Sequence, residues 1–189
     1  MRVGVFGGSF DPIHHGHLIV ARVVAETLGL EEVLLVPAAQ QPLKTGGHGA
    51  AAGHRLEMVR LAVGAAPGLR VEPLEIEAGG PSYTVDTLRA LSARRPGDRL
   101  HLLVGSDAAR LLPAWREPEA VRALADLVVF RREGDDGPLP ADAGVVAVPR
   151  IDISSTDVRE RVRRGRPVRY WVPDAVEAYI RTHSLYREA

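Results

Sequence analysis

The fold is decided by the stretch Val3-Gly4-Val5-Phe6-Gly7-Gly8-Ser9-Phe10-Asp11-Pro12-Ile13-His14-His15-Gly16-His17. Residues 3–6 are apolar and two glycines follow them at once, which predicts a short buried strand that ends in a tight turn. Apolar residues then recur at helical spacing from His15 to Leu28, and Gly29 provides the stop. The chain therefore begins with a strand, a glycine turn and a helix.

The same alternation continues along the chain. Further strands are expected at residues 33–36, within 69–76, and at 100–104, 127–130 and 145–148. Helices are expected at about 54–63, 84–93, 107–112, 118–124, 155–164 and from Pro173-Asp174 onward, where proline suits the first helical position. This pattern predicts a doubly wound, Rossmann-like α/β fold with a mainly parallel sheet. Ligands bind such sheets beyond the carboxyl ends of the strands, where the strand order reverses.

Length and composition narrow the class of protein. A chain of 189 residues suits one α/β domain, so we expect a single domain over 1–189. Its 24 basic residues balance 24 acidic ones, which argues against broad nucleic-acid binding. Cysteine is absent, which excludes disulfides and cysteine-based metal sites. No export signal or membrane-length apolar segment is recognisable, so we expect a cytoplasmic protein without membrane contacts.

The glycine turn and the start of the first helix predict an anion site. Gly7 and Gly8 let backbone N–H groups approach a phosphate, and the helix N-terminus adds unpaired donors. His14 and His17 lie three residues apart, so both imidazoles can face one point, and Gly16 leaves room for a nucleotide. A simple tight turn with surface histidines is the alternative. A zinc pair is disfavoured, because no HExxH context or third nearby ligand supports it.

A second anion site is predicted at Ile153-Ser154-Ser155-Thr156-Asp157-Val158-Arg159, where the penultimate helix starts. Ser155 or Thr156 is expected to cap this helix. By default Arg159 would be solvated. Hydroxyl groups, a helix N-terminus and an arginine together also suit the β- and γ-phosphates of ATP.

These two motifs resemble the signatures of the nucleotidylyltransferase superfamily. His14-His15-Gly16-His17 is similar to its (H/T)xGH motif, and residues 153–159 are similar to its ISSTxxR motif, in the same order. Weaker matches resemble the bacterial nicotinate-nucleotide adenylyltransferase branch. They are Pro81-Ser82-Tyr83-Thr84, Gly105-Ser106-Asp107 followed by Trp115, residues 127–134, 170–180 and 184–187.

The resemblance implies transfer of AMP from ATP to nicotinate mononucleotide, which yields deamido-NAD and pyrophosphate in NAD biosynthesis. It implies Mg²⁺ carried by the substrate phosphates, with no dedicated protein metal site, and leaves a homo-oligomer possible. The catalytic residues it implies are His14, His17, Lys44 and Arg159. The ATP contacts it implies are Gly7, Gly8, Ser9, Phe10, His14, Gly16, His17, Gly105, Asp107, Ile153, Ser154, Ser155, Thr156 and Arg159. The acceptor contacts it implies are Ser9, Lys44, Tyr83, Thr84, Trp115, Arg116 and Arg132.

The sequence departs from the branch in one loop. The family often shows Pro-Pro-His-Lys after the second strand, whereas this chain has Gln41-Pro42-Leu43-Lys44. Leu43 cannot make the polar contact of a histidine, so only Lys44 carries over. Simpler interpretations also exist for the acceptor residues, because Tyr83 and Trp115 could be core or surface aromatics and Thr84 could cap a helix.

Other functions stay open at this point. The acceptor could be nicotinamide mononucleotide, or phosphopantetheine, which the middle segments disfavour. A nucleotide-sensing module without turnover would keep both motifs. A nucleic-acid-binding role is suggested by a run of arginines that could equally form a solvated helix face beside Asp157 and Glu160. These arginines are Arg159, Arg161, Arg163, Arg164, Arg166 and Arg169.

Overall fold

The computed structural model describes residues 1–41, 49–64 and 66–187. One parallel sheet forms the centre of the fold, with the strand order β3-β2-β1-β4-β5-β6. The strands are β1 (Arg2–Gly8), β2 (Glu32–Pro37), β3 (Leu69–Val71), β4 (Arg99–Gly105), β5 (Asp126–Arg132) and β6 (Gly144–Val148). The predicted parallel α/β sheet is confirmed.

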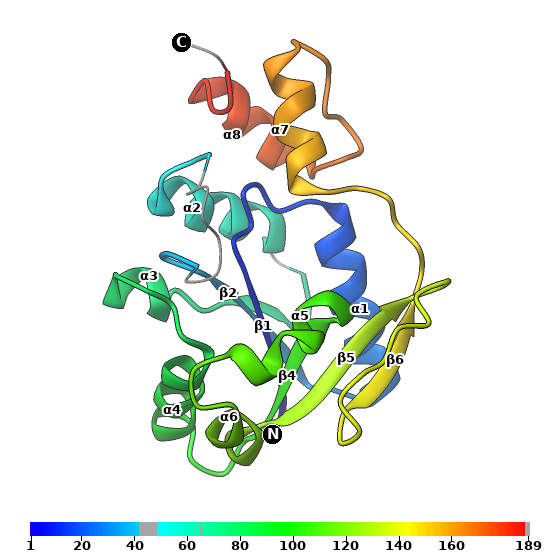
Figure 1. Ribbon diagram of the computed structural model, residues 1–189. Helices are drawn as coiled ribbons and strands as arrows, with labels where there is room; N and C mark the ends of the chain where they lie inside the picture. Colours follow the sequence, from blue (N-terminus) through cyan, green and yellow to red (C-terminus); the bar gives the residue numbers. More distant parts are fainter. Residues whose placement is uncertain (42–48, 65, 188–189) are drawn as a thin grey trace.

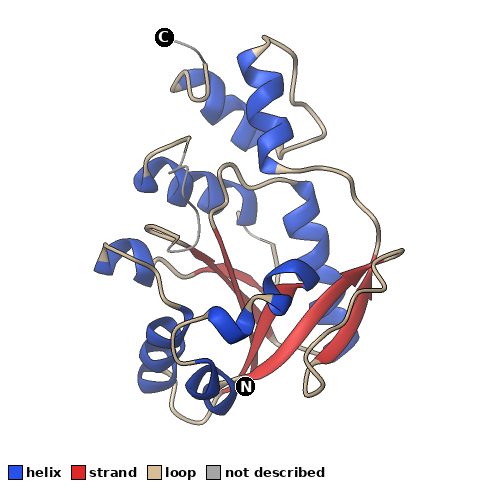
Figure 2. Cartoon of the chain, viewed as in Figure 1, coloured by secondary structure: helices blue, strands red, loops and turns tan. Residues whose placement is uncertain are grey.

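Helices cover both faces of this sheet (Figure 2). They are α1 (His15–Leu28), α2 (Ala52–Val63), α3 (Leu74–Ala78), α4 (Thr84–Arg94), α5 (Ser106–Arg110), α6 (Pro118–Leu124), α7 (Ser155–Arg163) and α8 (Asp174–Thr182), with a 3-10 turn at Leu112–Ala114. Figure 1 shows α7 and α8 beyond the end of β1, far from the N-terminus. The C-terminal helices therefore lie at the edge of the sheet where the glycine turn is.

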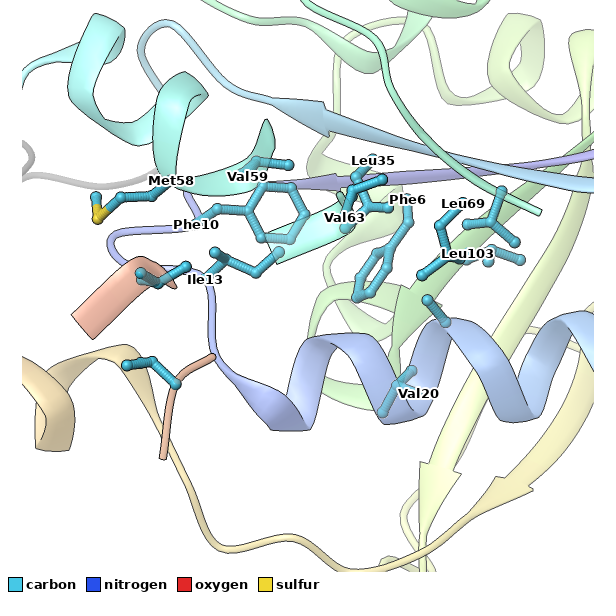
Figure 3. Close-up of a cluster of buried hydrophobic side chains, with 14 of the residues drawn as sticks. Phe6, Phe10, Ile13, Val20, Leu35, Met58, Val59, Val63, Leu69 and Leu103 are labelled. Carbon is cyan, nitrogen blue, oxygen red and sulfur yellow. The ribbon is translucent and has the colours of Figure 1, made fainter. Parts of the chain in front are cut away.

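Two apolar clusters hold the layers together. Val3 and Val5 point to the cluster under α4 and α6, whereas Phe6 points to the cluster under α1 and α2, as the two-residue period of a strand requires. Figure 3 shows this second cluster, in which Phe10 and Met58 join Phe6. Each fully buried side chain of this size contributes about 1.5–3 kcal/mol. The turn after β1 is thus anchored in a core.

The strand order reverses beside β1. The chain first adds β2 and β3 on one side of β1 and then returns to add β4, β5 and β6 on the other side. The crevice expected of such a sheet therefore lies beyond the carboxyl ends of β1 and β4. Residues 7–17 and Gly105 follow these two strands, so the predicted motifs fall at the reversal.

Some element boundaries differ from the sequence expectations. The strand predicted within 69–76 is confirmed but ends at Val71, and Leu74–Ala78 form helix α3, which the sequence reasoning did not predict. A strand could not easily continue here, because Pro73 lacks the N–H that a sheet needs. Pro173 was predicted as the first residue of the last helix. It instead precedes α8 with an extended backbone, at φ −56° and ψ 147°.

Candidate active site

The turn after β1 is folded tightly around Phe10. Phe10 is 1% exposed and takes a left-handed φ of 46°, which is rare for a bulky residue. Its ring makes edge contacts with Phe6 and with His17, at centroid distances of 5.8 and 5.0 Å. A Cβ on Gly8 would lie 3.0 Å from this ring, whereas one on Gly7 would meet nothing within 4 Å. Glycine is thus required at position 8 by packing, and the backbone at position 7 is open to a ligand.

The two histidines stack on each other at the start of α1. Their ring centroids are 3.7 Å apart at an interplanar angle of 29°, so the prediction that they face one point is confirmed. The backbone N–H of His14 donates to Nδ1 of His17 at 3.2 Å. In a neutral His17 the proton therefore sits on Nε2, which becomes the donor. A Cβ on Gly16 would approach the His14 ring to 3.0 Å, so Gly16 makes room for a histidine.

Burial keeps His14 neutral near pH 7. The residue is 5% exposed. Burial lowers the pKa of His14 from its ordinary value of 6.5 to about 4, and the nearby charges of Arg132 and His15 act in the same direction. Arg132 is the exposed last residue of β5. Its charge therefore acts on His14 from the end of β5.

The second predicted motif touches the first. Ser155 Oγ donates to the carbonyl of Pro12 at 2.9 Å, and Arg159 Nη1 donates to the carbonyl of Asp11 at 2.8 Å. The prediction that Ser155 or Thr156 caps the helix is wrong, because the hydroxyl of Ser154 accepts the Asp157 N–H as the N-cap. With Ser154 as the cap, the hydroxyl of Ser155 is available to bond the β1–α1 turn.

Asp11 ties two further segments to this turn, a role that the sequence reasoning missed. Its carboxylate accepts the N–H groups of Gly49 and Ala50 at 2.6 and 3.1 Å, and the hydroxyl of Tyr186 at 2.7 Å. Burial and the Asp11 charge raise the pKa of the Tyr186 hydroxyl. A Cβ on Gly49 would lie 2.8 Å from Arg159 Cδ, so glycine is needed there. The sequence did contain a signal for this role, because Asp11 is an acidic residue inside a turn that is otherwise suited to bind an anion.

The predicted acceptor residues gather at the start of α4. Tyr83 occupies the N-cap position and Thr84 is the first helical residue, so Thr84 is not the cap. The Arg116 guanidinium lies over the Tyr83 ring at 4.7 Å. Trp115 is half-buried against the cluster under α4 and α6, as Tyr83 is. The structure thus brings Tyr83, Thr84 and Arg116 together.

Hydrogen bonds join the segment just before α4 to the glycine turn through residues 38–41. The N–H of Ala38 donates to the carbonyl of Gly8 at 2.9 Å, and the hydroxyl of Ser9 donates to the Gln41 side chain at 2.6 Å. Ser82 accepts the N–H of Ala39 at 2.9 Å and donates its own N–H to Gln40 at 2.8 Å. We call residues 38–41 the bridging segment.

The structure also places most of the remaining predicted site residues. Ile153 is half-buried against the cluster under α1 and α2, and Thr156 receives a hydrogen bond from Arg159 at 3.2 Å. Gly105 is the N-cap of α5. The side chain of Asp107 is fully exposed, and it pairs with Arg110 at 2.9 Å. Lys44 and Leu43 lie outside the described residues.

Most arginines of the basic run have partners within the chain. Arg161 lies over the Trp171 ring at 4.6 Å and donates to the carbonyl of Pro167. Arg163 and Arg164 both pair with Glu160. Among residues 1–41, 49–64 and 66–187, no helix is long and apolar enough to cross a membrane, and no three His, Cys, Asp or Glu side chains are grouped as metal ligands.

Comparison with known proteins agrees with this geometry. The profile of the cytidylyltransferase-like family matches residues 5–161. A protein of Gemmatimonas aurantiaca named probable nicotinate-nucleotide adenylyltransferase is 48% identical, with 100% of this chain and 93% of that protein covered. A protein of Thermus thermophilus with the same name is also 48% identical, with 99% and 100% covered.

Solved structures share the fold. The nicotinic acid mononucleotide adenylyltransferase of Plasmodium falciparum, complexed with NaAD, superposes with a TM-score of 0.80 at 19% identity, covering 98% of this chain and 97% of its own. A putative nicotinate-nucleotide adenylyltransferase of Vibrio parahaemolyticus gives a TM-score of 0.72 at 18% identity, covering 100% and 98%. The chain belongs to the cytidylyltransferase-like family, and within it to the group whose curated members are named nicotinate-nucleotide adenylyltransferases.

Proposed function

We propose that this chain transfers AMP from ATP to nicotinate mononucleotide. The 5′-phosphate oxygen of the mononucleotide attacks the α-phosphorus of ATP. The bond from that phosphorus to the bridging oxygen breaks, and pyrophosphate leaves with the electron pair. The products are deamido-NAD and pyrophosphate. Full-length relatives that are 48% identical and carry this enzyme name support the assignment.

The observation that carries the mechanism is the joining of the two phosphate motifs. Ser155 and Arg159, at the start of α7, bond the carbonyls of Pro12 and Asp11 just before the histidine pair. The N-termini of α1 and α7 are therefore held next to each other, where their positive dipole ends favour a polyphosphate. Such fixed donors stabilise charge that develops on the phosphate oxygens during transfer.

Each of the two histidines acts in this proposal as a hydrogen-bond donor. His17 presents Nε2–H, because its Nδ1 is occupied by a backbone N–H. His14 stays uncharged because burial lowers its pKa to about 4. The attacking phosphate is already an oxyanion, so no protein nucleophile or general base is needed. Mg²⁺ enters with ATP as part of the substrate and neutralises its phosphate oxygens.

The remaining assignments extend from this centre. Arg159 and Lys44 add positive charge at the phosphates, and Arg132 faces them from the end of β5. Tyr83, Trp115 and Arg116 surround the pyridine ring. Thr84 and the free N–H groups of the α4 N-terminus receive its carboxylate. Ser9 contacts both nucleotides from the glycine turn.

The test uses ATP labelled at the α-phosphate. With nicotinate mononucleotide and Mg²⁺, we expect the label in a dinucleotide and none in the released pyrophosphate. His17→Ala should lower kcat by about 100- to 1,000-fold while the melting temperature changes little, because a donor aimed at transition-state charge is worth ~2.7–4 kcal/mol. Label in pyrophosphate or in inorganic phosphate would contradict the reaction, and an unchanged kcat in His17→Ala would contradict the role of that residue.

A further inference from the structure

Arg55, in the first turn of α2, is 0% exposed. Arginine is almost never fully buried without partners. Burial lowers the pKa of this guanidinium, and the nearby charge of Asp11 counters that effect. A charge is therefore kept inside the protein next to the glycine turn.

The guanidinium bonds carbonyl groups of three separate segments. Nη1 donates to Ser9 at 2.7 Å, Nη2 to Ala39 at 3.0 Å and Nε to Ala50 at 3.2 Å. Ser9 belongs to the turn after β1, Ala39 follows β2, and Ala50 precedes α2. A planar guanidinium can donate in three fixed directions at once, which the single ammonium of lysine cannot reproduce.

Through the carbonyl of Ala39, Arg55 is bonded to the bridging segment, residues 38–41. The carbonyl of Ala39 is held by Arg55, and its N–H is held by the hydroxyl of Ser82. Ser82 stands directly before Tyr83 and Thr84, on the acceptor side. Ser9, which the same guanidinium holds, lies in the glycine turn, where the ATP phosphates are proposed to bind. One side chain is thus bonded to the glycine turn and, at Ala39, to the bridging segment that is in turn bonded to Ser82.

We propose that Arg55 is a positioning residue for the transfer reaction, which sets the separation between the ATP side and the acceptor side by fixing Ser9 and Ala39. This inference rests on the proposed function. An in-line attack needs the reacting atoms about 3–3.5 Å apart, and a displacement of about 1 Å can cost about 100-fold in rate. Arg55 itself touches the backbone and acts through it.

The experiment compares three variants within α2. Arg55→Lys keeps the charge and loses the three-way geometry. Met58→Ala removes a 0%-exposed neighbour on the same face, which packs in the core of Figure 3 and makes no polar contact there. Arg60→Lys changes an exposed arginine that pairs with Glu57. Each is assayed for kcat and for both KM values, at a temperature where its melting curve shows a folded protein.

We expect Arg55→Lys to lower kcat at least about tenfold while the KM for ATP stays within about threefold. Met58→Ala and Arg60→Lys should keep kcat within about twofold of the wild type, although Met58→Ala melts at a lower temperature. The inference fails if folded Arg55→Lys keeps the wild-type kcat, or if Met58→Ala loses as much as Arg55→Lys does.

A second variant covers the case in which Arg55→Lys does not fold. Ser82→Ala releases the Ala39 N–H from the opposite side, and we expect a higher acceptor KM and a lower kcat. Exchange of the Ala39 amide with solvent reads the same bonding without turnover, and it should accelerate in Ser82→Ala and in Arg55→Lys but not in Met58→Ala. Unchanged constants and unchanged exchange would overturn the inference. An inactive wild type with accelerated exchange in the variants would instead overturn the proposed function.

Discussion

At the scale of single residues, the surroundings of His14 and His17 matter more than their spacing. The spacing predicted that both rings face one point, and the stacked pair confirms it. Spacing could not predict that His14 is buried or that the His14 N–H occupies Nδ1 of His17, because both depend on how the turn packs in three dimensions. The packing keeps His14 neutral, and the hydrogen bond from the His14 N–H orients the ring of His17.

The lowered pKa of His14 predicts how stability depends on pH. The unfolded chain takes up a proton near the ordinary pKa of 6.5, and the folded protein only near about 4. The contribution of neutral His14 to the free energy of unfolding is therefore fully present above pH 6.5. It decreases as the pH falls from 6.5 to about 4. The gap corresponds to about 3 kcal/mol in the free energy of unfolding.

Urea unfolding of the wild type and of His14→Gln between pH 7.5 and pH 4 would measure this effect. The difference in unfolding free energy between the two proteins should shrink or reverse at low pH, because the glutamine does not titrate. Other titrating groups, such as the buried His101, are present in both proteins and cancel. Parallel curves over the whole range would contradict a buried neutral His14.

The sequence did contain a signal for the buried position of Arg55. It shares one helix face with Met58, Val59 and Val63, so helical periodicity places it toward the core. A charged residue on the buried face of an amphipathic helix is a candidate for a structural or functional hydrogen-bond network. The carbonyls that Arg55 reaches come from distant segments and could not be named from sequence.

At the scale of elements, the key contact is between the start of α7 and the turn after β1. The sequence predicted both motifs and their order. It placed the cap at Ser155 or Thr156 because local preferences do not distinguish three neighbouring hydroxyl residues, and the structure uses Ser154. It also missed the short helix α3, whose five residues give too few turns for a period to be visible.

This contact predicts the result of Arg159→Ala. We expect ATP to bind about 10- to 150-fold more weakly, since loss of a charge-assisted hydrogen-bond set costs about 1.5–3 kcal/mol. Part of that loss reflects a looser turn, because Arg159 also holds the carbonyl of Asp11. The matched control is Arg163→Ala on the same helix, where the arginine is exposed and pairs with Glu160.

Titration calorimetry with ATP and Mg²⁺ would give both affinities. Arg163→Ala should bind ATP as the wild type does. Equal ATP affinity in Arg159→Ala and the wild type would remove Arg159 from the phosphate site and leave it with its role in holding the turn.

At the scale of the whole molecule, the strand order brings the site together. All strands predicted from apolar runs are present, and the reversal beside β1 puts the glycine turn, Gly105 and the end of β5 at one edge. The order of the strands could not be predicted from local patterns, because it depends on which strands pair. The length of the chain supplied the expectation of a single domain over 1–189, which stays a prediction, as does the role of Lys44.

The proposed reaction predicts which acceptor the protein prefers. A site that offers donors to a carboxylate leaves one of them facing an amide N–H₂ when nicotinamide mononucleotide binds, and an unpaired buried donor costs ~1–3 kcal/mol. We therefore expect nicotinate mononucleotide to exceed nicotinamide mononucleotide by at least about tenfold in kcat/KM. Thr84→Val, which removes the proposed side-chain donor at the start of α4, should reduce that ratio.

The measurement is kcat/KM for nicotinate mononucleotide, nicotinamide mononucleotide and phosphopantetheine at one fixed concentration of ATP and Mg²⁺. We predict pyrophosphate release with nicotinate mononucleotide as the best acceptor, by at least about tenfold over the amide. No pyrophosphate release with any of the three acceptors, or a preference for nicotinamide mononucleotide or phosphopantetheine, would contradict it.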